Sequence, residues 1–216
     1  MGRRMLRSSS WFTVLLVGVC LAIPAGAATL AVTVVDSEGQ PVPNAVVFLD
    51  SGTPTEPGPT QQMVQSGQSF NPDVLVVPVG TLVEFPNEDP FRHHVYSFSP
   101  AKQFELKLYG GDEIQQTVFD QPGEVALGCN IHDDMLGYIY VVDTNMYGKT
   151  DESGKVMIEG GVEGANYEAQ VWHPRLSGPT RRTAQTVTMG QPANFKIGLK
   201  RDRRNQSGSD FEDGAY

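Results

Sequence analysis

The sequence has very little cysteine. Only Cys20 and Cys129 occur in 216 residues, and Cys20 lies in an apolar run near the amino terminus. If that run is removed, Cys129 has no partner within the chain, which excludes an intramolecular disulfide. A lone thiol in an oxidising compartment requires protection, either by burial as an inert hydrophobic side chain or by a bond to a metal.

The sequence is also poor in basic residues. Sixteen Lys and Arg stand against 25 Asp and Glu, and without residues 1–27 the balance becomes 13 against 25, a net charge of −12. Such a chain lacks the basic surface that binds phosphate backbones, so we expect no nucleic-acid partner. The acidity is compatible with a basic or dipolar protein partner.

No apolar run is long enough to span a membrane. The first residues combine a basic start, an apolar stretch from Trp11 to Ile23, and the A-x-A pattern Ala25-Gly26-Ala27. This order predicts a signal peptide over 1–27 and a mature protein that begins at Ala28, is periplasmic or secreted, and has no stable membrane insertion. An uncleaved anchor and a lipid anchor at Cys20 are the alternatives.

Enzyme motifs are absent as well. The chain has no G-x-S-x-G, P-loop or H-E-x-x-H pattern, and therefore no recognisable nucleophile, phosphate cradle or hydrolytic metal site. The adjacent Asp133 and Asp134 are interpreted as solvated side chains and not as an acid/base pair. We expect a protein that is not an enzyme.

Short segments with period-two alternation recur along the chain, separated by Gly, Pro, Asn and Asp, while helical patterns are almost absent. The pattern predicts an all-β protein built from sandwiches, in which one face of each strand packs on a core. In the clearest segments, alternate residues are expected on opposite faces of a strand. The paired faces are Leu30-Val32-Val34 and Ala31-Thr33-Val35, Phe104-Leu106-Leu108 and Glu105-Lys107-Tyr109, and Tyr167-Ala169-Val171 and Glu168-Gln170-Trp172.

A candidate metal site lies in the segment "GCNIHDDMLGY", residues 128–138. Cys129 and His132 have C-x-x-H spacing, and Met135 follows three residues later. A thiolate, an imidazole and a thioether together suit copper best, because zinc prefers further Cys, His or carboxylate ligands, and calcium and magnesium avoid sulfur. A trigonal His₂Cys site needs a second histidine from elsewhere in the chain.

The segment "FPNEDPFRHHVYSF", residues 85–98, supplies that histidine. It resembles the upstream ligand segment of the cupredoxins, the family of plastocyanin, amicyanin and pseudoazurin, and the downstream loop resembles that of amicyanin in its short C-x-x-H-x-x-M spacing. The whole chain resembles the cupredoxin-type methylamine utilization proteins. The matching positions of the upstream segment are Phe85, Asn87, Phe91, His93 and Val95.

The resemblance implies a Greek-key cupredoxin β-sandwich with one mononuclear copper, Cu(II)/Cu(I), bound by His93, Cys129, His132 and Met135. The family has Asn where this chain has His94, so His94 either supports the ligands from behind, as Asn87 would, or competes with His93 for the metal. The implied function is electron transfer between redox protein partners, through the exposed edge of His132. An apolar patch of Pro90, Phe91 and Leu136 would surround that edge.

Three other functions stay open. A copper carrier or storage protein would hold Cu(I) without redox turnover, and a structural β-sandwich would keep the four ligands as a vestige. The weakest alternative is an enzyme in which Met135 does not coordinate and leaves an open position on the metal.

The flanking segments have a different pattern. Residues 32–49 and 150–174 resemble the two halves of a small transthyretin-like or carboxypeptidase-regulatory-like β-sandwich. We therefore expect this second sandwich to comprise 28–50 plus 145–200, with the cupredoxin domain, 51–144, inserted in it and a disordered tail over 201–216. One continuous sandwich with extra edge strands is the alternative.

Overall fold

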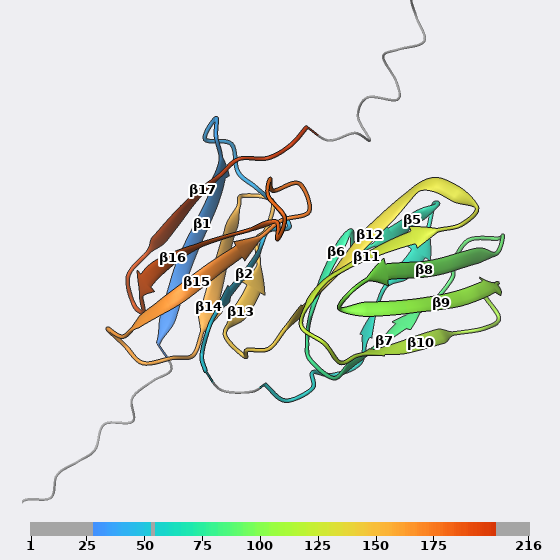
Figure 1. Ribbon diagram of the computed structural model, residues 1–216, viewed down its shortest axis with the longest axis horizontal. Coiled ribbons are helices and arrows are strands. Elements are labelled where there is room, and N and C mark those ends of the chain that lie inside the picture. The colour runs from blue at the N-terminus through green and yellow to red at the C-terminus, as the bar shows by residue number, and fades with distance from the viewer. Residues whose placement is uncertain (1–27, 53–54, 202–216) are drawn as a thin grey trace, which may run out of the picture.

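The computed structural model describes residues 28–52 and 55–201 (Figure 1). The predicted signal peptide lies outside the described residues, as does the predicted disordered tail apart from Arg201. All regular elements in the described part of the chain are β-strands, so the all-β prediction is confirmed. That part contains no helix with the length and hydropathy needed to cross a membrane.

Strands from the two ends of the described chain form one β-sandwich, here called the terminal sandwich (Figure 1). In one sheet, β1 pairs with β14 in antiparallel and with β17 in parallel orientation. The other sheet is antiparallel and has β2 at its centre beside β15. The strand order of the first sheet is β14 (Lys155–Glu159), β1 (Thr29–Asp36), β17 (Ala193–Ile197). The strand order of the second sheet is β13 (Tyr147–Lys149), β2 (Val46–Leu49), β15 (Asn166–Trp172), β16 (Arg182–Thr188).

All strands between β2 and β13 form a second β-sandwich, here called the central sandwich. Strands distant in sequence pair within it, β6 with β12 and β8 with β11, as the predicted Greek-key sandwich requires. One sheet has the order β10 (Gln115–Phe119), β7 (Thr81–Phe85), β3 (Gln61–Gln62). The largest sheet has the order β6 (Val74–Pro78), β12 (His132–Val142), β11 (Gly123–Cys129), β8 (His93–Ser99), β9 (Lys102–Tyr109). A separate hairpin is formed by β4 (Val64–Ser66) and β5 (Ser69–Asn71).

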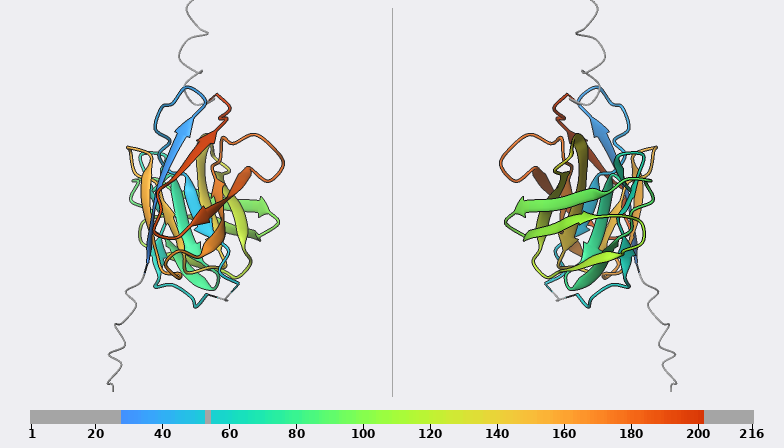
Figure 2. Two further views of the ribbon diagram at one scale, coloured as in Figure 1. Left: turned by 90° about the vertical axis from the view of Figure 1, so that its left-hand side faces the viewer. Right: turned by 90° about the vertical axis from the view of Figure 1, so that its right-hand side faces the viewer.

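Each sandwich has its own hydrophobic core. In β1 the predicted alternation holds, since Leu30, Val32 and Val34 are at most 1% exposed and point into the terminal core. Each fully buried aliphatic side chain of this kind contributes about 1.5–3 kcal/mol through removal of apolar surface from water. The two sandwiches lie one after the other along the long axis of the molecule (Figure 1), and they overlap when the molecule is viewed along that axis (Figure 2).

Strand β9 departs from the predicted alternation. Leu108, assigned to the face of Leu106, is 47% exposed, whereas Tyr109 is 2% exposed. The register explains the difference, because Val95 pairs with Leu106 but His93 pairs with Tyr109, so β9 has one residue more than β8 between these pairs. This β-bulge exchanges the buried and exposed faces of β9 beyond it, so Tyr109 is buried beside His93 at the start of β8.

Trp172 also departs from the prediction. Alternation placed it on the outer face of β15 with Glu168 and Gln170, yet its side chain is fully buried. The outer face of β15 meets the central sandwich here, and the Trp172 ring lies 4.8 Å from that of Tyr140 and 5.8 Å from that of Tyr138, both on β12. This junction, here called the seam, has a small hydrophobic cluster of its own.

Candidate metal centre

The hairpin of β11 and β12 positions two of the predicted ligands. Val125, Leu127 and Cys129 alternate on the buried face of β11, so Cys129 points into the central sandwich and is 4% exposed. A register shift after Gly128 pairs Cys129 with His132, the first residue of β12. The tight turn between them therefore holds the thiol and the imidazole on the same side of the hairpin.

Strand β8 supplies the second imidazole. His93 is its first residue and lies on the buried face with Val95, whose register partner on β11 is Cys129. His93 is fully buried. Because β8 and β11 are hydrogen-bonded neighbours, a histidine 36 positions before the cysteine arrives beside it.

The three side chains converge. The Cys129 Sγ lies 3.6 Å from the His93 Nδ1 and 3.7 Å from the His132 Nδ1, and all three atoms lie within 4.8 Å of one another. A metal bound about 2.3 Å from a sulfur and about 2.0–2.1 Å from a nitrogen, at angles of about 110–120°, separates these atoms by about 3.6–3.8 Å. The donor set therefore fits a single metal ion that accepts one thiolate and two imidazoles.

Asp89 orients His93. Its Oδ2 lies 2.8 Å from the His93 Nε2, and its two oxygens accept the backbone N–H groups of Gly67 and Gln68 at the β4–β5 turn. Burial opposes ionisation of Asp89, but the hydrogen bonds from Gln68, His93 and Gly67 outweigh it and lower the pKa of this carboxyl group below its ordinary value. A charged carboxylate on Nε2 keeps the proton there and turns the lone pair of Nδ1 toward Cys129.

The sequence reasoning did not identify Asp89 as part of the site. The sequence held one indication of its role, because Asp89 stands four residues before His93 in the turn that contains Asn87. Only the β4–β5 turn, which is distant from any ligand in the sequence, makes the role of this carboxylate visible.

Asn87 shapes the same turn. Its Nδ2 donates to the carbonyl oxygens of Phe91, at 2.8 Å, and Tyr109, at 3.2 Å, and its Oδ1 accepts the backbone N–H of Asp89 at 2.9 Å. Because Asn87 is 6% exposed, these bonds form away from water and hold the loop firmly. Asn87 thus acts on His93 through the loop that carries Asp89 and Phe91.

His94 lies apart from the three converging side chains. Its Nε2 is 2.8 Å from the Glu105 Oε1 on the neighbouring strand β9, and its side chain is partly exposed. The backbone of His94 nevertheless links the two ligand segments, since its carbonyl accepts the N–H of Asn130 at 3.1 Å. This link is made by the main chain, so it does not depend on the side chain at this position.

Met135 is 2% exposed and belongs to the same hydrophobic core cluster as Cys129 and Leu127. It follows His132 by three residues on β12, and its side chain packs in the interior of the central sandwich. A thioether is a soft donor and the usual weak axial ligand of copper sites.

The partly exposed His132 lies beside an exposed aromatic ring. The ring of Phe91 lies 5.5 Å from that of His132 and 5.2 Å from that of His93. Phe91 and Leu136 are each 39% exposed, and Ile131, which the sequence reasoning did not include, is 50% exposed. The exposed Asp133 and Asp134 follow directly in the chain.

Together, the fold and the site define an all-β protein with a buried cysteine and two histidines arranged for one soft metal ion. Neither the family models nor the curated proteins provide a match.

The solved structures to which the chain is similar include the following three proteins. It is 31% identical to a Cu-containing nitrite reductase from Thermus scotoductus SA-01 (TM-score 0.38), over 51% of this chain and 28% of that one. It is 22% identical to a purple cupredoxin from Nitrosopumilus maritimus (TM-score 0.34), over 38% and 99% of the two chains. It is 18% identical to a reduced amicyanin variant (TM-score 0.35), over 44% and 98%.

Proposed function

We propose that this protein is an exported type 1 copper protein that carries single electrons between redox partners and is not an enzyme. One observation carries the proposal: a buried thiol lies 3.6 and 3.7 Å from two imidazole Nδ1 atoms. The proposed ligands are His93, Cys129, His132 and Met135. One thiolate, two imidazoles and a thioether favour copper over zinc, calcium or magnesium.

Copper, when bound, supplies a reversible Cu(II)/Cu(I) couple. The protein's part is to hold the ligands still, so that a change of one electron requires little rearrangement. Asp89 keeps the Nε2 proton of His93 in place, and the bond from the Asn130 N–H to the His94 carbonyl joins the two ligand segments. Burial keeps water from Cys129, which also protects the lone thiol from oxidation.

His132 is the proposed route by which electrons enter or leave. Its ring is the one partly exposed imidazole of the cluster, and the exposed Phe91, whose ring lies 5.5 Å away, together with the preceding residue Ile131 would offer an apolar contact surface. Electron-transfer complexes use small interfaces that form and dissociate quickly. The donor and the acceptor would both use this surface, with Asp133 and Asp134 adding an electrostatic preference for the partner.

We also propose that the chain consists of two domains. The cupredoxin domain, 51–144, would be inserted in a transthyretin-like domain of 28–50 plus 145–200, which serves as a scaffold. This division is supported by the assignment of every strand from β3 to β12 to the central sandwich. Removal of a signal peptide, 1–27, would place the protein in the periplasm or outside the cell.

The test is the visible and EPR spectrum of the purified chain after addition of one equivalent of Cu(II). We expect an intense thiolate-to-copper band and narrow copper hyperfine splitting, both absent in Cys129→Ser. The neighbouring histidines provide a matched pair: His93→Gln should remove the band, and His94→Gln should keep it. A pale tetragonal copper spectrum in the unmodified chain would contradict electron transfer and favour a copper carrier or a structural role.

A further inference from the structure

A cavity of about 560 Å³ opens at the seam between the two sandwiches. Its walls come from the connection between β1 and β2, from β6 and β12 of the central sandwich, and from residues 173–181 and 199–201. Ligand-binding cavities commonly have volumes of about 300–1,000 Å³ and often lie where two domains meet.

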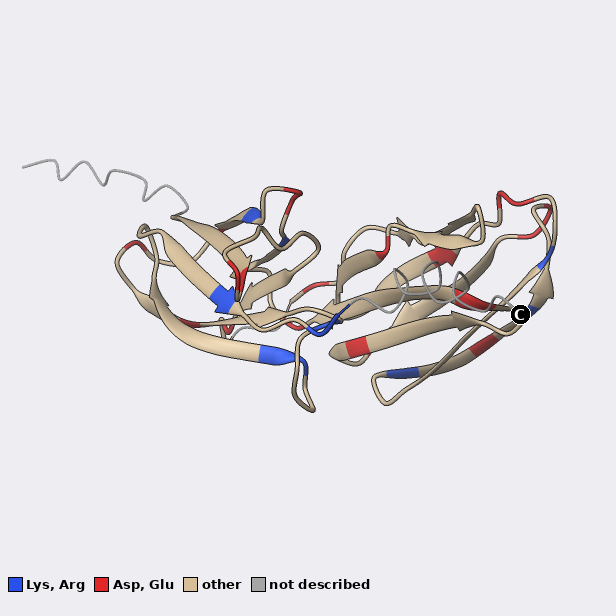
Figure 3. Ribbon diagram, turned by 90° about the horizontal axis from the view of Figure 1, so that it is seen from above, with Lys and Arg blue, Asp and Glu red and all other residues tan. Residues whose placement is uncertain are grey.

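The charges in this cavity oppose those of the chain as a whole. Arg175, Arg181, Lys200 and Arg201 line it, while the chain has a net charge of −9. Viewed from above, segments of Lys and Arg lie together where the two sandwiches meet (Figure 3). The cavity therefore concentrates positive charge in an acidic protein.

The carboxylates nearby do not balance these cations. Arg181 pairs with Glu124, whose Oε1 is 3.0 Å away and which is not part of the lining. Within residues 28–52 and 55–201, the other three cations take part in no salt bridge. Only Asp36 and Asp73 contribute negative charge to the lining.

The fold holds the cations together with hydrogen bonds. The backbone N–H of Lys200 donates to the Arg175 carbonyl at 2.8 Å, and the Arg175 Nε donates to the Lys200 carbonyl at 2.8 Å. An isolated bridge between Leu176 and Leu199 continues this pairing. Arg175 and Lys200 both line the cavity, and because like charges repel, positive charges held in one cavity favour the binding of an anion.

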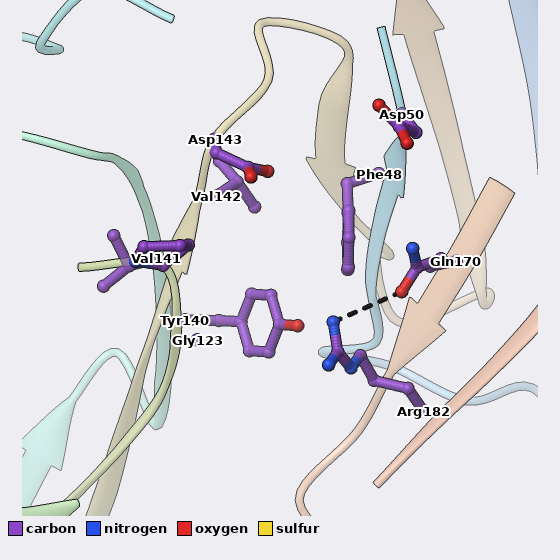
Figure 4. Close-up of a pocket in the computed structure, with 10 residues that line it drawn as sticks. Phe48, Asp50, Gly123, Tyr140, Val141, Val142, Asp143, Gln170 and Arg182 are labelled. Carbon is purple, nitrogen blue, oxygen red and sulfur yellow. Dashed lines mark hydrogen bonds between the residues drawn. The ribbon is translucent and has the colours of Figure 1, made fainter. Parts of the chain in front are cut away.

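The remaining wall of the cavity is largely apolar. Val74, Leu136, Tyr138 and Leu199 line it, and the Arg181 guanidinium carbon lies 6.0 Å from the centre of the Tyr138 ring. A smaller seam cavity of about 250 Å³ differs in this respect, because Asp50 and Asp143 accompany its only cation, Arg182 (Figure 4). In the smaller cavity two carboxylates therefore accompany one guanidinium, and that guanidinium already donates to the Gln170 Oε1 at 3.3 Å.

From this arrangement we infer that the larger cavity binds a small organic anion, with a carboxylate or phosphate group against Arg175, Lys200 and Arg201 and an apolar body against Leu136, Tyr138 and Val74. This site needs no copper and does not depend on the proposed electron transfer. It gives the terminal sandwich a binding role beyond that of a scaffold.

The test is calorimetric titration of the metal-free full chain with phenyl phosphate, benzoate, inorganic phosphate and benzyl alcohol. We expect one equivalent of an organic anion to bind at least about tenfold more tightly than inorganic phosphate, and the uncharged alcohol not to bind. The tighter of phenyl phosphate and benzoate identifies the head group. The inference is overturned if neither organic anion binds, or if inorganic phosphate binds as tightly.

Paired variants separate the cavity from general electrostatics. Lys200→Gln with Arg201→Gln removes two cations of the lining and should weaken binding about tenfold or more, since charged hydrogen bonds to the anion are lost. Lys107→Gln with Lys196→Gln removes the same charge from exposed positions on β9 and β17 and should leave binding unchanged. Equal weakening by both pairs would overturn the inference.

Discussion

The terminal and central sandwiches are stabilised in different ways. The terminal core consists mainly of apolar side chains, and the buried Thr150 beside it donates to the Val42 carbonyl and accepts the Ala45 N–H. The central sandwich buries His93, Cys129, Asn87 and Gln65, and each needs a partner. The Gln65 Nε2, for example, donates to the Phe85 carbonyl at 3.2 Å and to the Tyr109 hydroxyl. The comparison teaches that the sandwich with the candidate site buries more polar side chains, several of them bonded around that site, while its neighbour buries fewer and relies more on apolar packing.

The seam joins these two kinds of structure. Trp172 packs its ring on Tyr138 and Tyr140, and its Nε1 donates to the Glu124 Oε2 at 3.0 Å. Arg181 holds the other oxygen of the same carboxylate. One residue of the terminal sandwich thus contacts both β11 and β12, the strands that carry three of the proposed ligands.

The largest effect is expected when this junction is broken. Trp172→Ala should lower the free energy of unfolding by about 3–5 kcal/mol, because it removes a fully buried aromatic side chain and one charged hydrogen bond. Calorimetry should show the two sandwiches unfolding in separate transitions. Trp172→Phe keeps the packing but not the bond and should cost less. A single, unshifted transition in Trp172→Ala would show that the sandwiches do not depend on the seam.

Equivalent core deletions should sharpen the comparison. Ile139→Ala in the central core and Ile158→Ala in the terminal core each remove a fully buried side chain and should cost about 2–5 kcal/mol. In a Trp172→Ala background, where the two sandwiches unfold separately, copper at about 100 times its dissociation constant should restore about 2.7 kcal/mol to the central variant, because it binds only the folded central site. Thermal unfolding measures both variants in that background, and equal stabilisation of the two by copper would contradict the expectation that copper acts on the central sandwich alone.

The two His–carboxylate pairs of β8 provide a smaller, more local test. Asp89→Asn should weaken copper binding about 10–100-fold, because the amide no longer holds the Nε2 proton of His93 as the carboxylate does. Glu105→Gln changes the partner of His94 in the same way and should leave copper affinity unchanged. Competition titration with a Cu(I) chelator measures both, and similar losses would argue against the selection of His93 as the ligand.

The smallest effect is one of pH. Burial raises the pKa of Tyr140 at the seam from 10.0 to about 12, against a smaller opposing effect of Arg182. The unfolded chain therefore loses this proton first, and the stability is fully present below pH 10 and lost as the pH rises toward 12. The loss should reach about 2 kcal/mol near pH 12. Denaturant unfolding of Tyr140→Phe should show a correspondingly flatter decline, and an identical decline would exclude Tyr140 as its cause.

Several features could be predicted from local patterns. The alternation in residues 30–35 gives the correct buried face of β1, and the chemistry of Cys129 and His132 is evident from their spacing alone. The reversed faces of Leu108 and Tyr109 could not be predicted, because a bulge depends on how β9 pairs with β8. The burial of Trp172 could not be predicted either, because it depends on a second sandwich covering a face that the local pattern marks as outer.

The sequence by itself determined the all-β class and the kind of donor atoms available, because alternation and ligand chemistry are properties of short segments. Only the tertiary structure decided which groups meet. Strand pairing placed His93 beside Cys129, the β4–β5 turn fixed Asp89 behind His93, and the seam gathered Arg175 and Lys200 around one cavity. These contacts depend on strand register and on packing between distant segments, which local periodicity does not encode.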